Sequence, residues 1–493
     1  MSQHYLSPQD RHQVEMFSSL DDRIIDDNPV RLMDLLVDLI VDANPDRFQK
    51  KGNSNVWRKA YSPQTLLKLY LYGYLNSISS SRKLERETGR NIELMWLLGN
   101  LQPDHKTISD YRKDNGDEIR LVTLEFRKFL KEQKYIRGKN MAIDGTRLRG
   151  NTRQSMLTFK KIRRRLKHAE EELLKYLDVL RNNDRLDQCA DEYEDPDQVN
   201  LSLIEKIAEL EEKIRVLQSI ESKMKEEGKG TYSTTDPDAT LIKSANGYVA
   251  GYNIQAMVDE EHKMIAYAEA ESEPNDTREL AKAMPRLKEQ LQITPEEVEA
   301  DKGYFRRDDV HDLDQQSETQ YYVGVPEPQG RKKEDKNAGI SFEYDPDKDL
   351  FNCSEGKTLP LKQKNRQRSY GIVDVYQGKD CQGCRLQSLC TSSKYGRIIN
   401  RRKEPDLWLV EYRKRMKSLE ARKKLRKRKA IVEHPFGTLK IIMGKIPIKV
   451  RGKGKVQTEI DLYATIYNLK RLFNIESFDK IKAMILQYDW KVG

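Results

Sequence analysis

Cysteine is scarce in this sequence, with five residues among 493. So few thiols argue against a disulfide framework and indicate a reducing compartment. Long apolar runs are also missing: the stretch from Leu35 to Val41 already contains Asp38, whereas a membrane-spanning helix needs about 20 apolar residues. The first residues show no secretory signal, and no GxxxxGK(S/T) loop or strand-linked GxGxxG loop occurs. We therefore expect a cytoplasmic protein that uses neither a membrane nor a bound nucleotide.

Charge, in contrast, is abundant and unevenly placed. The chain has 89 Lys+Arg against 79 Asp+Glu, a net charge of +10. The segment from Glu411 to Lys455 contains 17 Lys+Arg and 3 acids, so it alone carries +14 and the rest of the chain −4. Such a run is usually a solvated helix face. The alternative is a surface that binds the phosphates of a polyanion.

The residue pattern predicts four regions along the chain. Residues 1–135 read as short helices broken by Gly or Pro, which fits either a helix-turn-helix array or a helical scaffold that contacts no DNA. Residues 136–327 and 411–493 alternate strands and helices in the order of a mixed α/β sheet. Within them, two apolar stripes between 155 and 230 predict an antiparallel helical hairpin. Residues 328–410 read as an insertion too polar to form its own core.

Two carboxylates stand at the ends of predicted strands. Asp144 ends an apolar stretch before Gly145, and Asp301 ends another with Gly303 two residues later. A third carboxylate, Glu433, falls in a predicted helix. If the fold brings these groups together, they repel one another unless a metal ion neutralises them, and Mg²⁺ prefers carboxylate oxygens. The alternative is that all three are ordinary capping and turn acids.

Four of the five cysteines fall in the insertion. Cys381 and Cys384 form a CxxC pair, Cys390 follows six residues later, and Cys353 precedes them. Four thiolates suit tetrahedral Zn²⁺, and a bound ion can stabilise a polar segment. The alternatives are a redox CxxC and unpaired thiols, but redox pairs usually open a helix, whereas this pair lies in a Gly/Asp-rich loop. We therefore predict a structural zinc site.

Several blocks of the sequence resemble one known protein family. NMAIDGT, EADKGYF and IVEHPFGTLK resemble the three catalytic blocks of DDE transposases from bacterial insertion sequences, most closely insertion-sequence family eleven-eighty-two. GYNIQAMVDEEHKMI resembles the family's central hairpin and ATIYNLKRLF its closing helix, so the resemblance runs from about Asp26 to Phe473. It implies an α/β fold with an RNase H-like mixed-sheet core. An all-α N-terminal DNA-binding domain would precede this core, and the helical hairpin and the four-cysteine zinc-type insertion would interrupt it.

The resemblance also assigns roles to the acids. Asp144, Asp301 and Glu433 match the three catalytic acids, which would hold two Mg²⁺ ions or Mn²⁺ in their place. Lys440, seven residues after Glu433, matches a basic residue of the family that meets a phosphate.

Two further family positions differ in this chain. The family has an Arg four residues before the Glu and a Tyr three residues before that Arg. Here Lys429 and Arg426 stand at these positions. Lys429 keeps the charge but the aromatic ring is missing, so Tyr412 or Arg428 can take part of its role. We expect Arg426, Arg428, Lys429 and Lys440 to contact DNA.

The activity that the resemblance implies is that of a DNA transposase. Such an enzyme binds the terminal inverted repeats of its element, cuts a strand with a metal ion and transfers the 3′ end to target DNA. The alternatives are a nuclease of the same fold without strand transfer and a transposase-derived DNA-binding protein without catalysis. We expect double-stranded DNA as the partner, a homodimer because two element ends must meet, and a place at the bacterial nucleoid.

Overall fold

The computed structural model describes most of the chain, in residues 19–48, 60–153, 156–186, 196–244, 247–316, 318–326, 340–368, 371–381, 383–391, 393, 395–401, 407–443 and 448–491. It divides into two compact units. The first comprises Met1–Arg137, Gly145–Pro274 and Glu433–Gly493, and the second comprises Gly138–Asp144 and Asn275–Val432. Among the helices of the described residues, none has the length and apolar character that a membrane crossing requires.

The N-terminal part of the first unit is helical. Its helices are η1 (Asp21–Arg23), α1 (Pro29–Ala43), α2 (Pro45–Phe48), α3 (Pro63–Leu75), α4 (Ser81–Thr88), α5 (Ile92–Leu97), α6 (His105–Asp114) and α7 (Gly116–Glu132). Four of these helices begin after a side chain that accepts a hydrogen bond from the helix backbone: Asn28, Ser62, Asn91 and Asp104. Such N-caps satisfy backbone donors that have no partner inside the helix, so the local sequence sets these helix starts.

The closing helices are α16 (Lys453–Ile475) and α17 (Phe478–Gln487). The sequence predicts an amphipathic helix over Asp461–Asn474. The helix is present as part of α16, but it is not amphipathic, because α16 is buried on all sides from Val456 to Leu469. It contacts α3 and α7 as well as strand β6 (Ile265–Glu271). The N-terminal helices and the closing helix therefore share one core.

Two polar side chains of α16 explain why this helix can be buried all round. Gln457 accepts a hydrogen bond from the Ala270 backbone N–H at 2.7 Å and donates to the Ala268 carbonyl at 3.0 Å. Asn468 accepts from the Ile265 N–H at 2.8 Å and donates to its carbonyl at 2.9 Å. These amides satisfy backbone groups of β6 that no strand pairs, which is how proteins protect a sheet edge.

The mixed sheet has the strand order β4-β5-β1-β7-β8, and the residues of β1 (Asn140–Arg149) are divided between the two units. In the first unit β5 (Gly247–Asp259) pairs antiparallel with β4 (Thr240–Ser244) and with β6. In the second unit β1 pairs parallel with β7 (Glu297–Ala300), and β7 pairs parallel with β8 (Gln320–Val323). Helices α10 (Glu279–Leu291) and α11 (Arg307–Gln316) and the turn η2 (Lys302–Tyr304) connect the strands of the second unit. The fold is mixed α/β with a mixed sheet.

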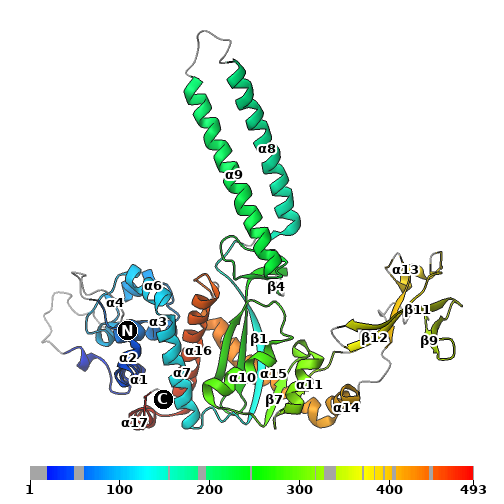
Figure 1. Cartoon of the computed structure of the whole chain (residues 1–493). Helices are drawn as coiled ribbons and strands as arrows, with labels where there is room; N and C mark the ends of the chain where they lie inside the picture. Colours follow the sequence, from blue (N-terminus) through cyan, green and yellow to red (C-terminus); the bar gives the residue numbers. More distant parts are fainter. Residues whose placement is uncertain are drawn as a thin grey trace, which may run out of the picture. The chain divides into compact units, whose positions relative to one another are not determined.

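The predicted helical hairpin is present in the first unit as α8 (Phe159–Leu186) and α9 (Pro196–Glu226), which lie side by side in opposite directions (Figure 1). Short strands β2 (Leu157–Thr158) and β3 (Thr231–Tyr232) pair where the hairpin begins and ends. A small apolar cluster joins the two helices at this end: Leu157, Ile162, Leu217, Ile220 and Met224.

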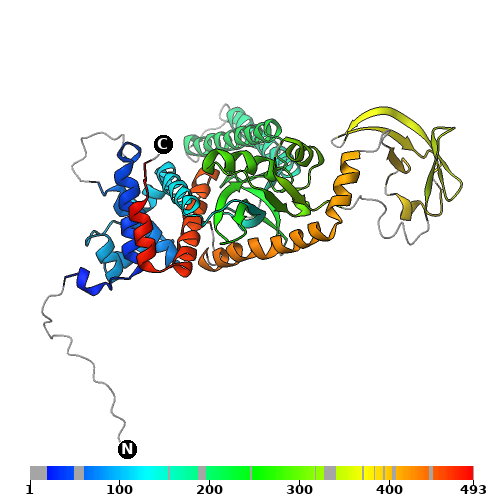
Figure 2. The same ribbon diagram turned by 90° about the horizontal axis from the view of Figure 1, so that it is seen from below.

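The insertion of the second unit forms a sheet of its own. Five strands lie in the order β13-β12-β11-β10-β9. They are β9 (Phe342–Asp345), β10 (Leu350–Cys353), β11 (Thr358–Arg368), β12 (Gly371–Gln377) and β13 (Ile398–Arg401), with the short helix α13 (Gln387–Cys390). Leu359, Val373, Val375 and Tyr376 are buried in it. The expectation that this insertion lacks a core is therefore wrong. After it follow α14 (Leu407–Met416) and the continuous helix α15 (Leu419–Met443), drawn in orange in Figure 2.

Charged side chains are buried between α7, α16 and β6. Arg127 Nη2 lies 3.9 Å from Asp461 Oδ1, and Arg120 Nη1 lies 3.7 Å from Asp461 Oδ2. Arg120 also pairs with Glu269 of β6. Burial raises the pKa of Asp461 from its ordinary 3.8 to about 6, although both arginines oppose this rise. Burial also lowers the pKa of Arg127. Folding therefore carries an electrostatic cost at this point.

We expect the contribution of Asp461 to the free energy of unfolding to fall as the pH rises from about 4 to about 6. Asp461 binds its proton more tightly in the folded chain than in the unfolded chain, so its stabilising contribution is complete below pH 3.8 and is lost above the folded pKa of about 6. Relative to the parent, Asp461→Asn should become more stable across this window by up to about 3 kcal/mol. Urea denaturation at several pH values measures the difference. Parallel pH profiles of the two proteins would contradict this assignment.

Candidate active site

The register of β1 against β7 determines where two of the predicted acids lie. Asn140 pairs with Glu297, Met141 with Val298 and Ala142 with Glu299. This constant offset, continued by two residues, places Asp144 opposite Asp301. Asp301 follows β7 directly and its backbone is still extended. Since neighbouring strands lie about 4.8 Å apart, the two carboxylates are neighbours.

Helix α15 crosses the three parallel strands of the second unit with side chains spaced four residues apart. Glu420 accepts from the Tyr322 hydroxyl of β8 at 3.2 Å, Lys424 pairs with Glu297 of β7, and Arg428 Nη1 lies 3.1 Å from Asp144 Oδ2 of β1. Residues at this spacing share one helix face. The helix is therefore held in register with the strands, and its last contact in the series is with a predicted catalytic acid.

A buried tyrosine shows which charges gather at the strand ends. Tyr304, in η2, is 1% exposed. Burial raises the pKa of Tyr304 well above its ordinary value, and the nearby carboxylates of Asp276, Asp144 and Asp301 raise it further, whereas the guanidinium of Arg428 lowers it. Three carboxylates and one guanidinium therefore surround this ring. Sequence reasoning did not single out Asp276, because it follows no apolar strand and stands in the loop before α10.

Gly303 allows the carboxylates to approach the turn after β7. Its backbone N–H donates to Asp301 Oδ1 at 2.6 Å. A Cβ atom at this position would lie 2.8 Å from that same oxygen and 3.6 Å from Asp276 Oδ2. A larger residue here would therefore displace the Asp301 carboxylate.

The other predicted site residues lie on α15 or next to it. Glu433 is exposed and follows Arg428 by five residues on the same helix. Arg426, Lys429 and Lys440 are also exposed on α15. The Arg428 side chain, in contrast, is only 13% exposed and is engaged by Asp144.

Tyr412 does not take the role that sequence reasoning offered it. Its hydroxyl donates to the Tyr321 carbonyl and accepts from the Val323 N–H, both at 3.0 Å. The ring is buried, and burial raises its pKa to about 12. Tyr412 therefore holds β8 in place and is not a surface residue.

The donor chemistry of the strand ends suits a hard divalent cation. Asp144 and Asp301 supply neighbouring carboxylate oxygens, which Mg²⁺ prefers, and Asp276 lies beside them. Within the described part of the chain, however, no three Asp, Glu, His or Cys side chains lie close enough together to hold a metal ion. In this structure the countercharge for Asp144 is the guanidinium of Arg428.

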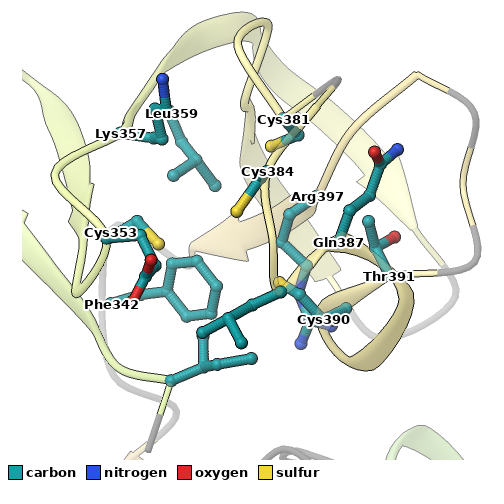
Figure 3. Close-up of a pocket in the computed structure, with 13 residues that line it drawn as sticks. Phe342, Cys353, Lys357, Leu359, Cys381, Cys384, Gln387, Cys390, Thr391 and Arg397 are labelled. Atoms are coloured by element: carbon teal, nitrogen blue, oxygen red, sulfur yellow. Dashed lines mark hydrogen bonds between the residues drawn. The ribbon is translucent and has the colours of Figure 1, made fainter. Parts of the chain in front are cut away.

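The four predicted zinc ligands line a single cavity of the insertion (Figure 3). Cys353 ends β10, Cys381 and Cys384 lie in the loop after β12, and Cys390 ends α13; all four are free thiols. Arg385 pairs with Glu355 at 2.8 Å and links the two thiol-bearing segments. The prediction of a zinc site is nevertheless not confirmed, because no three of these cysteines, as the structure describes them, lie close enough together to hold a metal ion.

Two family models match parts of this chain. Residues 18–114 match a model described as Transposase domain (DUF772), and residues 352–473 match one described as Transposase DDE domain. The second match contains Glu433, the four cysteines and most of α16, and neither match extends to Asp144 or Asp301. No curated protein matches the chain.

One solved structure aligns with most of the chain. It is the cryo-EM structure of a piggyBac transposase synaptic complex with hairpin DNA, which covers 93% of this chain and 79% of its own at 9% sequence identity. The TM-score of 0.30 is too low to establish a shared fold.

Gly303→Ala should impair DNA strand cleavage without unfolding the protein. The added methyl group must displace the Asp301 carboxylate or the turn, and a displacement of about 1 Å in an active site can cost roughly 100-fold in rate. Cleavage rates and thermal unfolding measure the two effects separately. If Gly303→Ala cleaves DNA at the parent's rate, the exact position of the Asp301 carboxylate does not determine the cleavage rate.

Proposed function

Because two transposase family models match parts of this chain, we propose that it is a DDE transposase of the insertion-sequence type that binds the terminal inverted repeats of its own element, cuts a DNA strand there and joins the freed 3′ end to target DNA. The observation that carries this proposal is the β1–β7 register, which supports Asp144 and Asp301 as a catalytic pair. Glu433 is the third acid. A homodimer follows from the reaction, since two element ends must be held together.

The architecture of the core supports an RNase H-like fold. Strand β1 lies between β5 and β7, and it pairs parallel with β7. Asp144 lies within β1, and Asp301 follows the adjacent strand directly. The helix that carries Glu433 is fixed to these strands by contacts four residues apart.

Each residue of the proposed site has a task that follows from its charge and burial. Asp144, Asp301 and Glu433 would hold Mg²⁺, or Mn²⁺ in its place, which when bound promotes attack by an oxygen and stabilises the leaving one. Arg428 offsets the charge of Asp144 and limits carboxylate repulsion. Tyr304 fills the space beneath the acids and keeps water from their protein side. The exposed cations Arg426, Lys429 and Lys440 are placed to bind DNA phosphates.

Asp301→Asn should abolish cleavage of DNA that contains the element end, in the presence of Mg²⁺. The amide keeps the shape of the side chain but loses the charge that binds a metal ion. A matched control is Asp312→Asn, which changes an exposed acid of α11. If Asp301→Asn cuts as fast as the parent, the catalytic assignment is wrong. A joining assay then separates the alternatives, because a nuclease cuts the end but transfers no strand.

We further propose that Zn²⁺ binds the four cysteines and draws their thiols together. The cavity offers the number and kind of ligands that a structural zinc site uses. Metal analysis of the purified protein should give one zinc per chain, and Cys384→Ser should lower both the zinc content and the thermal stability. Zinc close to zero with all four thiols free to react would remove this proposal.

A further inference from the structure

A second cationic stretch lies outside the run near Glu433. From Gly145 to Ala169 the sequence has nine Lys+Arg and no Asp or Glu. This stretch covers the second half of β1, the connection to β2 and the first three turns of α8. Its charges are spread over three kinds of structure, so it does not read as one basic helix.

The connection between β1 and α8 is held by the segment around β3. Thr152 Oγ1 lies 2.6 Å from Ser233 Oγ, and the Arg153 N–H donates to Thr235 Oγ1 at 3.1 Å. Strand β2 directly precedes α8 and pairs with β3, so the start of α8 is also held by the segment around β3. Arg153 and the first cations of α8 are therefore held close together.

The turn before α16 adds a further cation to this region. The backbone N–H groups of Gly452 and Lys453 donate to Asp236 Oδ1 at 3.1 Å and Asp238 Oδ2 at 2.8 Å. Arg451 Nε donates to the Asn151 carbonyl at 2.8 Å. Arg451 is exposed, so the rest of its guanidinium is accessible to a partner.

The cations of this region point away from the core. On β1, Thr146 and Leu148 line an internal cavity, whereas Arg147 and Arg149 are exposed. On α8, the residues at helical spacing from Ile162 pack inward. Three exposed cations share the opposite helix face: Lys160, Arg164 and Lys167.

Acids near these cations are already engaged. Asp236 accepts from the Tyr252 hydroxyl at 2.8 Å as well as from Gly452, and it is fully buried. Glu271 pairs with Lys453 at 2.7 Å, and Glu221 lies 3.5 Å from Arg163. These contacts neutralise Lys453 and part of Arg163. Glu171 lies 3.7 Å from Lys167, and the remaining exposed cations keep a positive surplus.

We propose that these cations form a surface, the basic root, that binds the phosphate backbone of duplex DNA of any sequence and so holds the target DNA. The basic root comprises Arg147, Arg149, Arg153, Lys160, Arg164, Lys167 and Arg451. Phosphate contacts by Lys and Arg position DNA without reading its bases, which suits a target but not an element end. This inference rests on the proposed transposase function and adds a second DNA surface to it.

The test compares two triple variants of the full chain. The root variant carries Arg149→Glu, Lys160→Glu and Arg164→Glu. The control carries Lys175→Glu, Arg181→Glu and Lys206→Glu, exposed cations farther from the root on the same hairpin. Lys175 lies about 17 Å along α8 from Arg164, the nearest position that the root variant changes on this helix, and this exceeds the Debye length of about 10 Å at 0.1 M salt.

Fluorescence anisotropy with a random-sequence DNA duplex at several salt concentrations gives the affinity and its salt dependence. For the root variant we expect about 100-fold weaker binding near 0.1 M salt and a log–log salt slope smaller by roughly 2 to 3, because each lost phosphate contact removes about 0.9. Cleavage at element ends should persist while strand transfer into the target falls. The control should match the parent.

Different results overturn different statements. If the parent neither binds nor cuts DNA, the proposed function fails. If the parent does both and the root variant keeps the parent's affinity and salt slope, only the basic root is wrong. If the root variant binds a duplex RNA more weakly than the parent does but keeps the parent's affinity for DNA, duplex DNA is not the partner of the basic root. If the root variant unfolds at a lower temperature than the parent, a second variant with Gln at the same three positions must still show a smaller log–log salt slope than the parent.

Discussion

The parallel pairing of β1 with β7 is the interaction on which the proposed chemistry of this protein depends. Its constant register places Asp144 and Asp301 side by side although 156 residues separate them in the chain. Shifting this register by one residue would turn one carboxylate to the opposite face of the sheet. The helical hairpin lies between the two strands in sequence, and the sheet can accommodate it because its ends meet at β2 and β3.

Bringing carboxylates together has an electrostatic cost, and α15 offsets it. Arg428 supplies a positive charge at Asp144, and Lys424 does the same for Glu297 one strand away. The same helix carries Glu433 and several exposed cations, so the residues that we propose to hold a metal ion and to bind DNA share one element. The N-terminal helices and α16 form a separate core with its own buried charges.

The sequence points to Asp144 and Asp301 because each follows a short apolar stretch. The prediction that Asp144 ends its strand is wrong, because β1 continues to Arg149. Sequence reasoning could not give their register, which depends on pairing between distant segments. It missed Asp276, which has no strand before it, and misjudged α16, because Gln457 and Asn468 read as surface residues although they bond the edge of β6. The sheet of the insertion was missed because its apolar residues are too few to show alternation, and the basic root because its charges are not consecutive.

Crystals of the full chain grown with Mn²⁺ would test the central claim most directly, since the anomalous signal locates the ion without assumptions about the fold. We expect a Mn²⁺ peak within bonding distance of carboxylate oxygens of both Asp144 and Asp301, with the guanidinium of Arg428 moved from its position beside Asp144. A Mn²⁺ ion bound elsewhere, or an electron density map in which these two aspartates are not neighbours across β1 and β7, would contradict the account.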